Sequence, residues 1–227
     1  GSAGERCMAI SAVLAVGDDT ADQFVSALAP KVRALKIGQY DEPGVEMGPL
    51  ITRESKERVT NYINQGEADG AEVVVDGRGL SLQGYEDGFF VGGTLLDRVT
   101  ADMSVYRDEI FGPVLSVLRP KTYEEAVNLV MTHEYGNGTA IFTRDGDAAR
   151  EFANNVNVGM VGVNVPIPVP VAYHSFGGWK ASMFGDHSIH GMEGVRFYTK
   201  LKTVTARWPS GIKDGAVFNF HSGSETK

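Results

Sequence analysis

Along most of this chain, short apolar segments alternate with segments of helical periodicity, and this alternation most constrains the fold. We expect strands at the apolar or β-branched segments 10–16, 72–75, 89–96, 113–118, 139–143 and 156–163. We expect helices over residues 18–35, 54–65, 122–131 and 145–152. Strands that alternate with helices form a mostly parallel sheet flanked by helices, so the sequence predicts the α/β class.

Side-chain chemistry marks where three of these helices begin or break. Thr122 and Glu125 form a capping box in front of an apolar periodic segment. Asp145 can accept hydrogen bonds from the free N–H groups of the following helix. Pro30 has no N–H group, so it should bend or split the helix expected over residues 18–35.

The pattern changes after Gly194. Residues 195–206 form a threonine-containing stretch that we expect to be extended, and residues 209–227 are a polar, glycine-rich tail that we expect to be frayed. The chain therefore divides into an α/β domain over 1–194 and an extended arm with its tail over 195–227. Such arms often pair with a sheet edge of another subunit, which predicts a homo-oligomer.

Charge and cysteine content exclude several classes of function. A net charge of −8 over 227 residues disfavours nucleic-acid binding, which needs a basic surface. No apolar run approaches the roughly 20 residues of a membrane span. One cysteine excludes an internal disulfide framework, and the five histidines lack metal-ligand spacing, so no metal site is expected. We expect a protein that acts on a small molecule in a reducing compartment, by default the cytoplasm.

The segment Gly4-Glu5-Arg6-Cys7-Met8-Ala9 contains the single cysteine. Cationic neighbours favour the thiolate form that attacks carbonyl carbons, and Arg6 is such a neighbour. A lone cysteine is also a common small core residue, and the segment by itself leaves both interpretations open.

Two further segments combine an aromatic ring with glycine. In Asp108-Glu109-Ile110-Phe111-Gly112-Pro113, the carboxylate can accept hydrogen bonds from ribose hydroxyls and the ring can pack on a flat heterocycle; a surface acid before a strand is the alternative. In Ser175-Phe176-Gly177-Gly178-Trp179-Lys180, two glycines permit a tight turn that presents Phe176 from a loop. The alternative there is an aromatic plug in an ordinary glycine turn.

In this order and spacing, the three segments together resemble the aldehyde dehydrogenase superfamily over nearly the whole chain. Segments 4–9, 136–142 and 162–170 are similar to its methylmalonate-semialdehyde branch, which is acylating and depends on coenzyme A. The resemblance implies that Cys7 attacks a semialdehyde, that hydride passes to NAD, and that coenzyme A takes the acyl group. The implied products are propionyl-CoA and acetyl-CoA.

The same resemblance implies roles for further residues. Arg6 suits the substrate carboxylate, because a guanidinium group binds a carboxylate with two parallel hydrogen bonds; a surface ion pair is the alternative. Phe176 is expected to line the aldehyde pocket. Glu109 is expected to bind the nicotinamide ribose, with Phe111 beside it. The Cys7 N–H group is expected to be one oxyanion donor.

Cys7 lies so near the start of the chain that we expect the chain to begin inside a longer protein. In the family, the dinucleotide-binding domain and a second oxyanion donor precede the cysteine, so we expect the isolated chain to have little or no activity. Two alternatives remain: a hydrolytic aldehyde dehydrogenase, and a non-catalytic oligomerisation or scaffold domain with Cys7 as core filler. The sequence does not rank malonate against methylmalonate semialdehyde.

Overall fold

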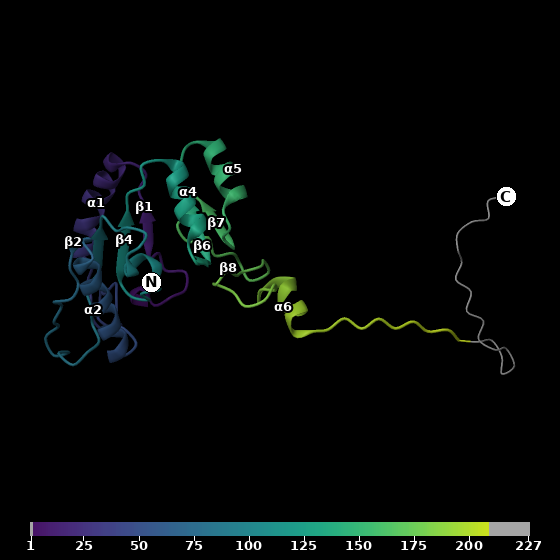
Figure 1. Cartoon of the computed structure of the whole chain (residues 1–227). Helices are drawn as coiled ribbons and strands as arrows, with labels where there is room; N and C mark the ends of the chain where they lie inside the picture. The colour runs from purple at the N-terminus through teal and green to yellow at the C-terminus, as the bar shows by residue number, and fades with distance from the viewer. Residues whose placement is uncertain (1, 209–227) are drawn as a thin grey trace.

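The computed structural model describes residues 2–208, and these form two α/β units that are joined between β4 and α4 (Figure 1). The first unit contains a four-stranded sheet of order β1-β4-β3-β2. Its strands are β1 (Ala12–Leu14), β2 (Glu72–Val75), β3 (Thr94–Asp97) and β4 (Val114–Leu118). Strands β1 and β3 both pair parallel with β4, whereas β2 is antiparallel to β3.

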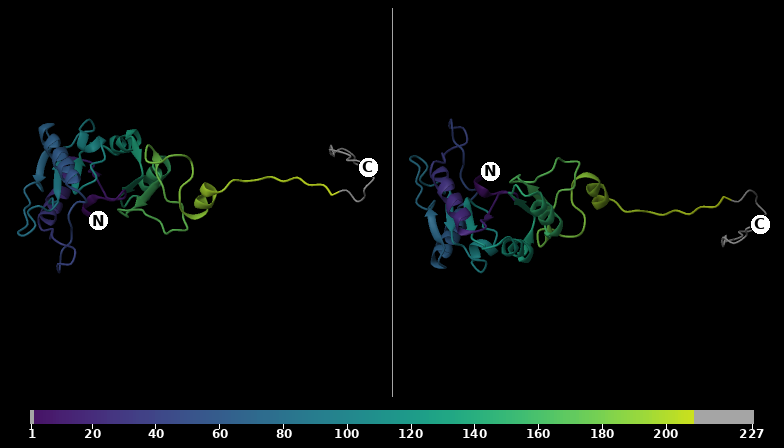
Figure 2. Two further views of the ribbon diagram at one scale, coloured as in Figure 1. Left: turned by 90° about the horizontal axis from the view of Figure 1, so that it is seen from below. Right: turned by 90° about the horizontal axis from the view of Figure 1, so that it is seen from above.

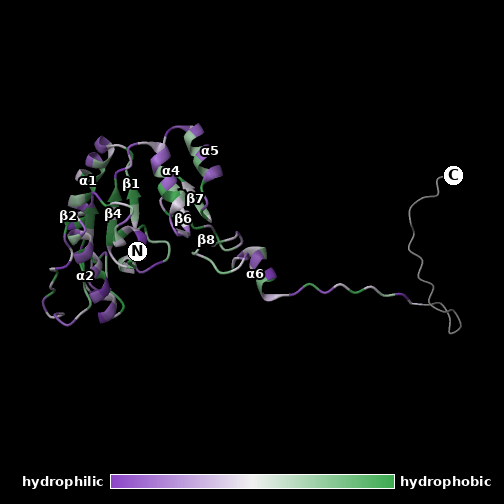
Figure 3. Cartoon of the chain, viewed as in Figure 1, coloured by the Kyte–Doolittle hydropathy of each residue, from purple (hydrophilic) through white to green (hydrophobic). Residues whose placement is uncertain are grey.

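Helices cover both faces of this sheet. They are α1 (Asp18–Arg33), α2 (Arg53–Ala68) and α3 (Ser104–Arg107). Because neighbouring strand residues point to opposite faces, the fully buried Leu95 packs in the α1 cluster and Leu96 packs in the cluster of α2 and α3. Figure 3 shows apolar strands enclosed by helices of mixed polarity. The predicted layered α/β architecture is therefore confirmed.

The second unit is smaller and has its own core. Its elements are α4 (Tyr123–Thr132), β5 (Tyr135–Gly136), β6 (Gly138–Ile141), α5 (Gly146–Asn155), β7 (Met160–Val163) and β8 (Trp179–Lys180). Strand β6 pairs parallel with β7, and β5 pairs antiparallel with β8. Phe152, Val156 and Val158 are buried against α4, β6 and β7. The predicted strands of this region thus pair with one another and not with the four-stranded sheet.

Both predicted helix caps are confirmed. Thr122 Oγ1 accepts a hydrogen bond from the Glu125 N–H group at 3.3 Å, while the Glu125 carboxylate accepts the Lys121 N–H group at 2.6 Å. Asp145 Oδ1 accepts the N–H groups of Asp147 at 2.8 Å and Ala148 at 3.2 Å. These side chains satisfy N–H groups that have no partner inside the helix.

Of the bend or split predicted at Pro30, the split does not occur, because α1 runs through Pro30 to Arg33. Two further local predictions are wrong. Residues 89–93 form no strand, because the Phe89 carbonyl accepts the Leu50 N–H group and Gly92 donates to Gly77, so this backbone bonds to loops. Residues 156–159 also precede the strand, because Val156 ends α5 by donating to the Phe152 carbonyl.

The prediction that residues 195–198 are extended is wrong. Residues 195–198 are not extended but belong to α6 (Gly191–Tyr198), a helix without buried residues. Residues 199–208 have no regular structure and run away from the folded units in every view (Figures 1 and 2), with Leu201 and Trp208 exposed. The predicted frayed tail, 209–227, lies outside the described residues. Within residues 2–208, no helix is both long and apolar enough to cross a membrane.

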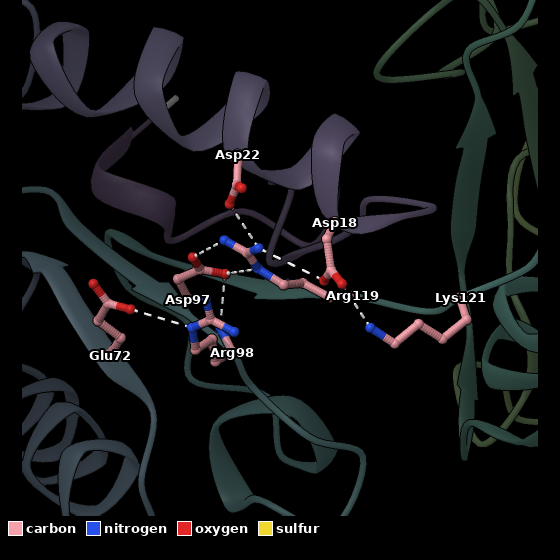
Figure 4. A network of polar contacts seen from close by, with 7 residues as sticks. All are labelled: Asp18, Asp22, Glu72, Asp97, Arg98, Arg119 and Lys121. Atoms are coloured by element: carbon pink, nitrogen blue, oxygen red, sulfur yellow. Dashed lines mark hydrogen bonds and ion pairs between the residues drawn. The ribbon is translucent and has the colours of Figure 1, made fainter.

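A buried ion pair ties the sheet to α1 (Figure 4). Asp97 is 2% exposed and accepts two hydrogen bonds from the Arg119 guanidinium group, at 2.9 and 2.6 Å. The third nitrogen of Arg119 reaches Asp22 at 2.7 Å. Burial alone would raise the pKa of Asp97, but the hydrogen bonds from Arg119 and from the Arg98 N–H group hold it below its ordinary value. The outer members of the network are Asp18, Glu72 and Lys121.

We predict that Asp97→Asn lowers the free energy of unfolding by about 3 kcal/mol at pH 7, because it leaves a buried guanidinium group without its charge partner. Since the pKa of Asp97 is lowered by folding, its stabilising contribution is complete above the ordinary pKa of about 3.9 and is lost as the pH falls through the lowered value. Urea denaturation across pH measures both effects. Asp19→Asn, at an exposed position of α1, is the matched control and should change little.

Candidate active site

Cys7 lies in a loop that leads from the short helix η1 (Ser2–Gly4) to β1. Two tight turns shape this loop, because the Glu5 N–H group donates to the Ser2 carbonyl and the Ala9 N–H group donates to the Arg6 carbonyl, both at 2.9 Å. The Cys7 side chain is exposed and forms no disulfide. The structure therefore presents the thiol to solvent and does not bury it as core filler.

The cysteine loop is in direct backbone contact with the segment of Phe111. A Cβ atom on Gly4 would lie 2.1 Å from the Gly112 carbonyl oxygen, and Gly4 has a φ of +75°. A side chain on Gly112 would in turn meet Val59 of α2 at 2.3 Å. Only glycine at both positions allows this approach. Two segments that lie far apart in the sequence therefore meet in the fold.

Phe111 is held in an uncommon backbone conformation with a φ of +55°. The Arg58 guanidinium group on α2 donates to the carbonyls of Ile110 at 3.3 Å and Phe111 at 3.5 Å. Phe111 is 37% exposed, so part of the residue is accessible to solvent. The backbone is thus fixed while the ring stays available for packing.

Glu109 differs from the neighbouring acid. Asp108 accepts a hydrogen bond from the Tyr62 hydroxyl at 3.2 Å, and burial, followed by the charge of Asp108, raises the pKa of Tyr62. Glu109 is exposed and makes no hydrogen bond or ion pair within residues 2–208. Its carboxylate therefore keeps its full capacity to accept hydrogen bonds from hydroxyl groups.

Arg6 is also exposed, and only its Nε atom is engaged, by donation to Ser2 Oγ at 2.9 Å. Its two terminal nitrogens have no hydrogen-bond partner in the described part of the chain. Glu5 points the other way, and its Oε2 atom accepts the Ile51 N–H group at 3.0 Å. The Glu5 contact anchors the loop, whereas the Arg6 fork remains free to bind an anion.

Phe176 lies in a loop of the second unit, where its ring packs on His190 with 5.3 Å between centroids. The two following glycines permit close backbone approach, because a Cβ on Gly178 would lie 3.1 Å from Asn137 Cα. The Lys180 ammonium group fixes the end of the loop. It donates to three carbonyls at the C-terminal end of α4, those of Val130, Met131 and His133, at 2.9 to 3.1 Å.

Burial lowers the pKa of Lys180 from its ordinary value, as expected for an ammonium group removed from water. The favourable carbonyl dipoles at the end of α4 offset part of that cost. Lys180 thereby joins β8 to α4 and holds the segment that carries Phe176.

Asn137 connects the two halves of the candidate site. Its side-chain nitrogen donates to the Cys7 carbonyl at 3.0 Å and contacts Met8 Sδ at 3.2 Å. The structure thus brings together Cys7, Phe111 and, through Asn137, the loop of Phe176. Sequence reasoning gave no role to Asn137, Gly4 or Lys180. The sequence shows only an asparagine between two glycines, and this pattern does not indicate which residue the asparagine contacts.

The chain belongs to the aldehyde dehydrogenase family. The family profile matches residues 1–204, and the cysteine loop, the Phe111 segment and the Phe176 loop occupy the order typical of it.

Within this family, the chain is similar to the following three proteins. It is 60% identical to a malonate-semialdehyde dehydrogenase of Pseudomonas aeruginosa over 92% of this chain and 42% of that protein. It is 48% identical to an acylating methylmalonate-semialdehyde/malonate-semialdehyde dehydrogenase of Bos taurus, over 92% of this chain and 38% of that protein. A crystal structure from Sinorhizobium meliloti, described as a methylmalonate-semialdehyde dehydrogenase complexed with NAD, matches with a TM-score of 0.91 and 60% identity. That match covers 94% of this chain and 44% of the other.

We predict that Gly4→Ala destabilises the first unit by at least about 1 kcal/mol, since a left-handed backbone alone costs that much for alanine. The clash with the Gly112 carbonyl adds to this cost. Chemical denaturation measures the loss. Gly48→Ala is the matched control, because a Cβ there meets nothing within 4 Å. Equal stability of the two variants would contradict the close approach.

Proposed function

We propose that this chain supplies the cysteine-bearing part of an NAD-dependent, coenzyme-A-acylating dehydrogenase of malonate or methylmalonate semialdehyde. The observation that carries the proposal is the contact between the loop of Cys7 and the segment of Phe111. The names of the similar proteins support the substrate class. The chain spans less than half the length of these relatives. The proposed activity therefore also needs residues that correspond to the rest of those proteins.

In this proposal, Cys7 Sγ forms a bond to the aldehyde carbon while the carbonyl π electrons move to oxygen, which gives a thiohemiacetal. The Cys7 N–H group donates to that oxygen. NAD, when bound, would accept the hydride from this carbon, and the C=O bond re-forms as a thioester to Cys7. The coenzyme A thiol gives its proton to water and attacks the same carbon, and the Cys7 thiolate leaves. Loss of the substrate carboxylate as carbon dioxide, with uptake of a proton at the carbon it leaves, gives propionyl-CoA from the methylmalonate compound and acetyl-CoA from the malonate compound.

The residues of this chain fit these roles chemically. The free terminal nitrogens of Arg6 match a carboxylate, which distinguishes semialdehyde acids from neutral aldehydes. The unpaired Glu109 carboxylate suits ribose hydroxyls, and the partly exposed Phe111 suits the nicotinamide ring. Phe176 supplies an apolar wall to the aldehyde pocket. A thiolate nucleophile also favours a reducing compartment, and we propose the cytoplasm.

Turnover tests the function directly. We expect residues 1–227 alone to show little or no NAD reduction, and a fusion that places the N-terminal part of the Pseudomonas aeruginosa relative before residue 1 to be active. That fusion should need coenzyme A for turnover; efficient hydrolysis without coenzyme A would instead support a hydrolytic aldehyde dehydrogenase. No turnover under any condition, with an inert thiol, would support the scaffold alternative.

We predict that Cys7→Ser in the fusion lowers kcat by at least about 10³-fold, because serine is a much weaker nucleophile at neutral pH.

Arg6→Gln should raise KM for malonate semialdehyde by about 10-fold or more through loss of a charge-assisted bond. The matched control is propanal, which has no carboxylate and should respond little to Arg6→Gln. An equal loss for both aldehydes would contradict a carboxylate contact.

We further propose that α6 and residues 199–208 bind a second copy of this chain. The described arm exposes Leu201, Val204 and Trp208, and α6 exposes Val195 and Phe197, which is more apolar surface than a solvated segment usually presents. Light scattering after size exclusion should give an oligomer. Leu201→Asp with Val204→Asp should shift it toward monomer, whereas Lys202→Asp should not. A monomer at high concentration would contradict the proposal.

A further inference from the structure

Both N–H groups of the Asn137 side chain face the cysteine loop. The amide nitrogen lies 3.0 Å from the Cys7 carbonyl oxygen and 3.2 Å from Met8 Sδ. A carbonyl oxygen and a thioether sulfur only accept hydrogen bonds, so the side-chain oxygen of Asn137 cannot take this place. This part of the loop thus meets a donor that is uncharged and fixed in orientation.

The backbone of Asn137 is itself immobilised by the second unit. Its carbonyl accepts the Met160 N–H group of β7 at 3.2 Å. The preceding residue, Gly136, accepts the Gly159 N–H group at 2.9 Å and donates to Ser182 Oγ at 3.0 Å. Gly178 packs on the Asn137 Cα atom. Asn137 therefore cannot shift unless β7 and the loop of Phe176 shift with it.

The cysteine loop has its other anchors in the first unit. Glu5 binds the Ile51 N–H group, and Gly4 packs on Gly112. Between Cys7 and β1, the Ala9 N–H group donates to the Arg6 carbonyl at 2.9 Å, and the Ser11 carbonyl accepts the Ser116 N–H group of β4 at 3.0 Å. The hydrogen bond from Asn137 therefore links the Cys7–Met8 peptide to the unit that carries Phe176.

We propose that Asn137 is a positioning residue for the nucleophile. By holding the Cys7 carbonyl, it fixes the peptide that follows Cys7 and so places Sγ at a set distance from the aldehyde wall formed by the Phe176 loop. The role rests on the proposed function of Cys7. A displacement of a reacting group by about 1 Å can cost roughly 10²-fold in rate, so a single donor at this place has a large effect on catalysis.

Amide hydrogen exchange on the whole chain tests the contact itself. Asn137→Leu keeps the approximate volume but removes the donor, and we expect the protection factor of the Ala9 amide to fall at least about 10-fold at pH 7. The amides of β6 and β7 should keep theirs. Asn154→Leu, at an exposed site of α5 without a side-chain hydrogen bond, is the matched control and should change neither.

Asn137→Asp adds a rescue that tests the hydrogen bond to the Cys7 carbonyl. At pH 7 its carboxylate cannot donate and repels the Cys7 carbonyl, so it should behave like Asn137→Leu. Below its pKa, the protonated carboxyl donates O–H, and protection of Ala9 should return toward the wild-type value measured at the same pH. Unchanged Ala9 protection in Asn137→Leu, equal losses throughout β6 and β7, or no recovery in acid would each overturn the proposal.

Turnover of the fusion enzyme connects the contact to chemistry. Asn137→Leu should lower kcat by about 10- to 100-fold and leave KM for malonate semialdehyde within about threefold, because binding groups are untouched. A changed KM with an unchanged kcat would overturn the positioning role. If the fusion with wild-type Asn137 is inactive while the exchange results hold, the proposed function fails and the contact between Asn137 and Cys7 stands.

Discussion

The placement of Cys7 depends on the close backbone approach of Gly4 to the Gly112 carbonyl. This approach leaves no room for a Cβ atom on Gly4, and Val59 of α2 leaves none on Gly112; together they bring the cysteine loop onto the segment that also carries Phe111. The four-stranded sheet makes the approach possible, because β4 begins directly after this segment and pairs with β1, which follows the cysteine loop. Sheet pairing and glycine sterics therefore act together to assemble one half of the site.

The other half of the site comes from a second unit with a separate core. Lys180 fastens the Phe176 loop to the end of α4, and Asn137 extends from the turn between β5 and β6 to the cysteine loop. Cys7 thus lies where two units meet, which is a common place for a ligand site.

Local chemistry made much of the fold predictable. Thr122 and Asp145 satisfy the first N–H groups of their helices, and such caps operate within a few residues. Some segments do not adopt the structure that their pattern predicts. Residues 89–93 have strand-forming side chains, but Leu50 and Gly77 take up their backbone hydrogen bonds. Residues 195–198 have β-branched and aromatic character, yet they complete the helix that begins at Gly191.

The sequence by itself determined the chemistry of this protein: a single thiol beside a guanidinium group, an acid and an aromatic ring before a strand, and a glycine turn that carries Phe176, in the order of one enzyme family. Only the tertiary structure decided which of these groups meet and what holds them. The hydrogen bond from Asn137 to Cys7 joins residues 130 positions apart. A contact between residues so distant leaves no periodicity or cap in the sequence, because it exists only after both units have folded.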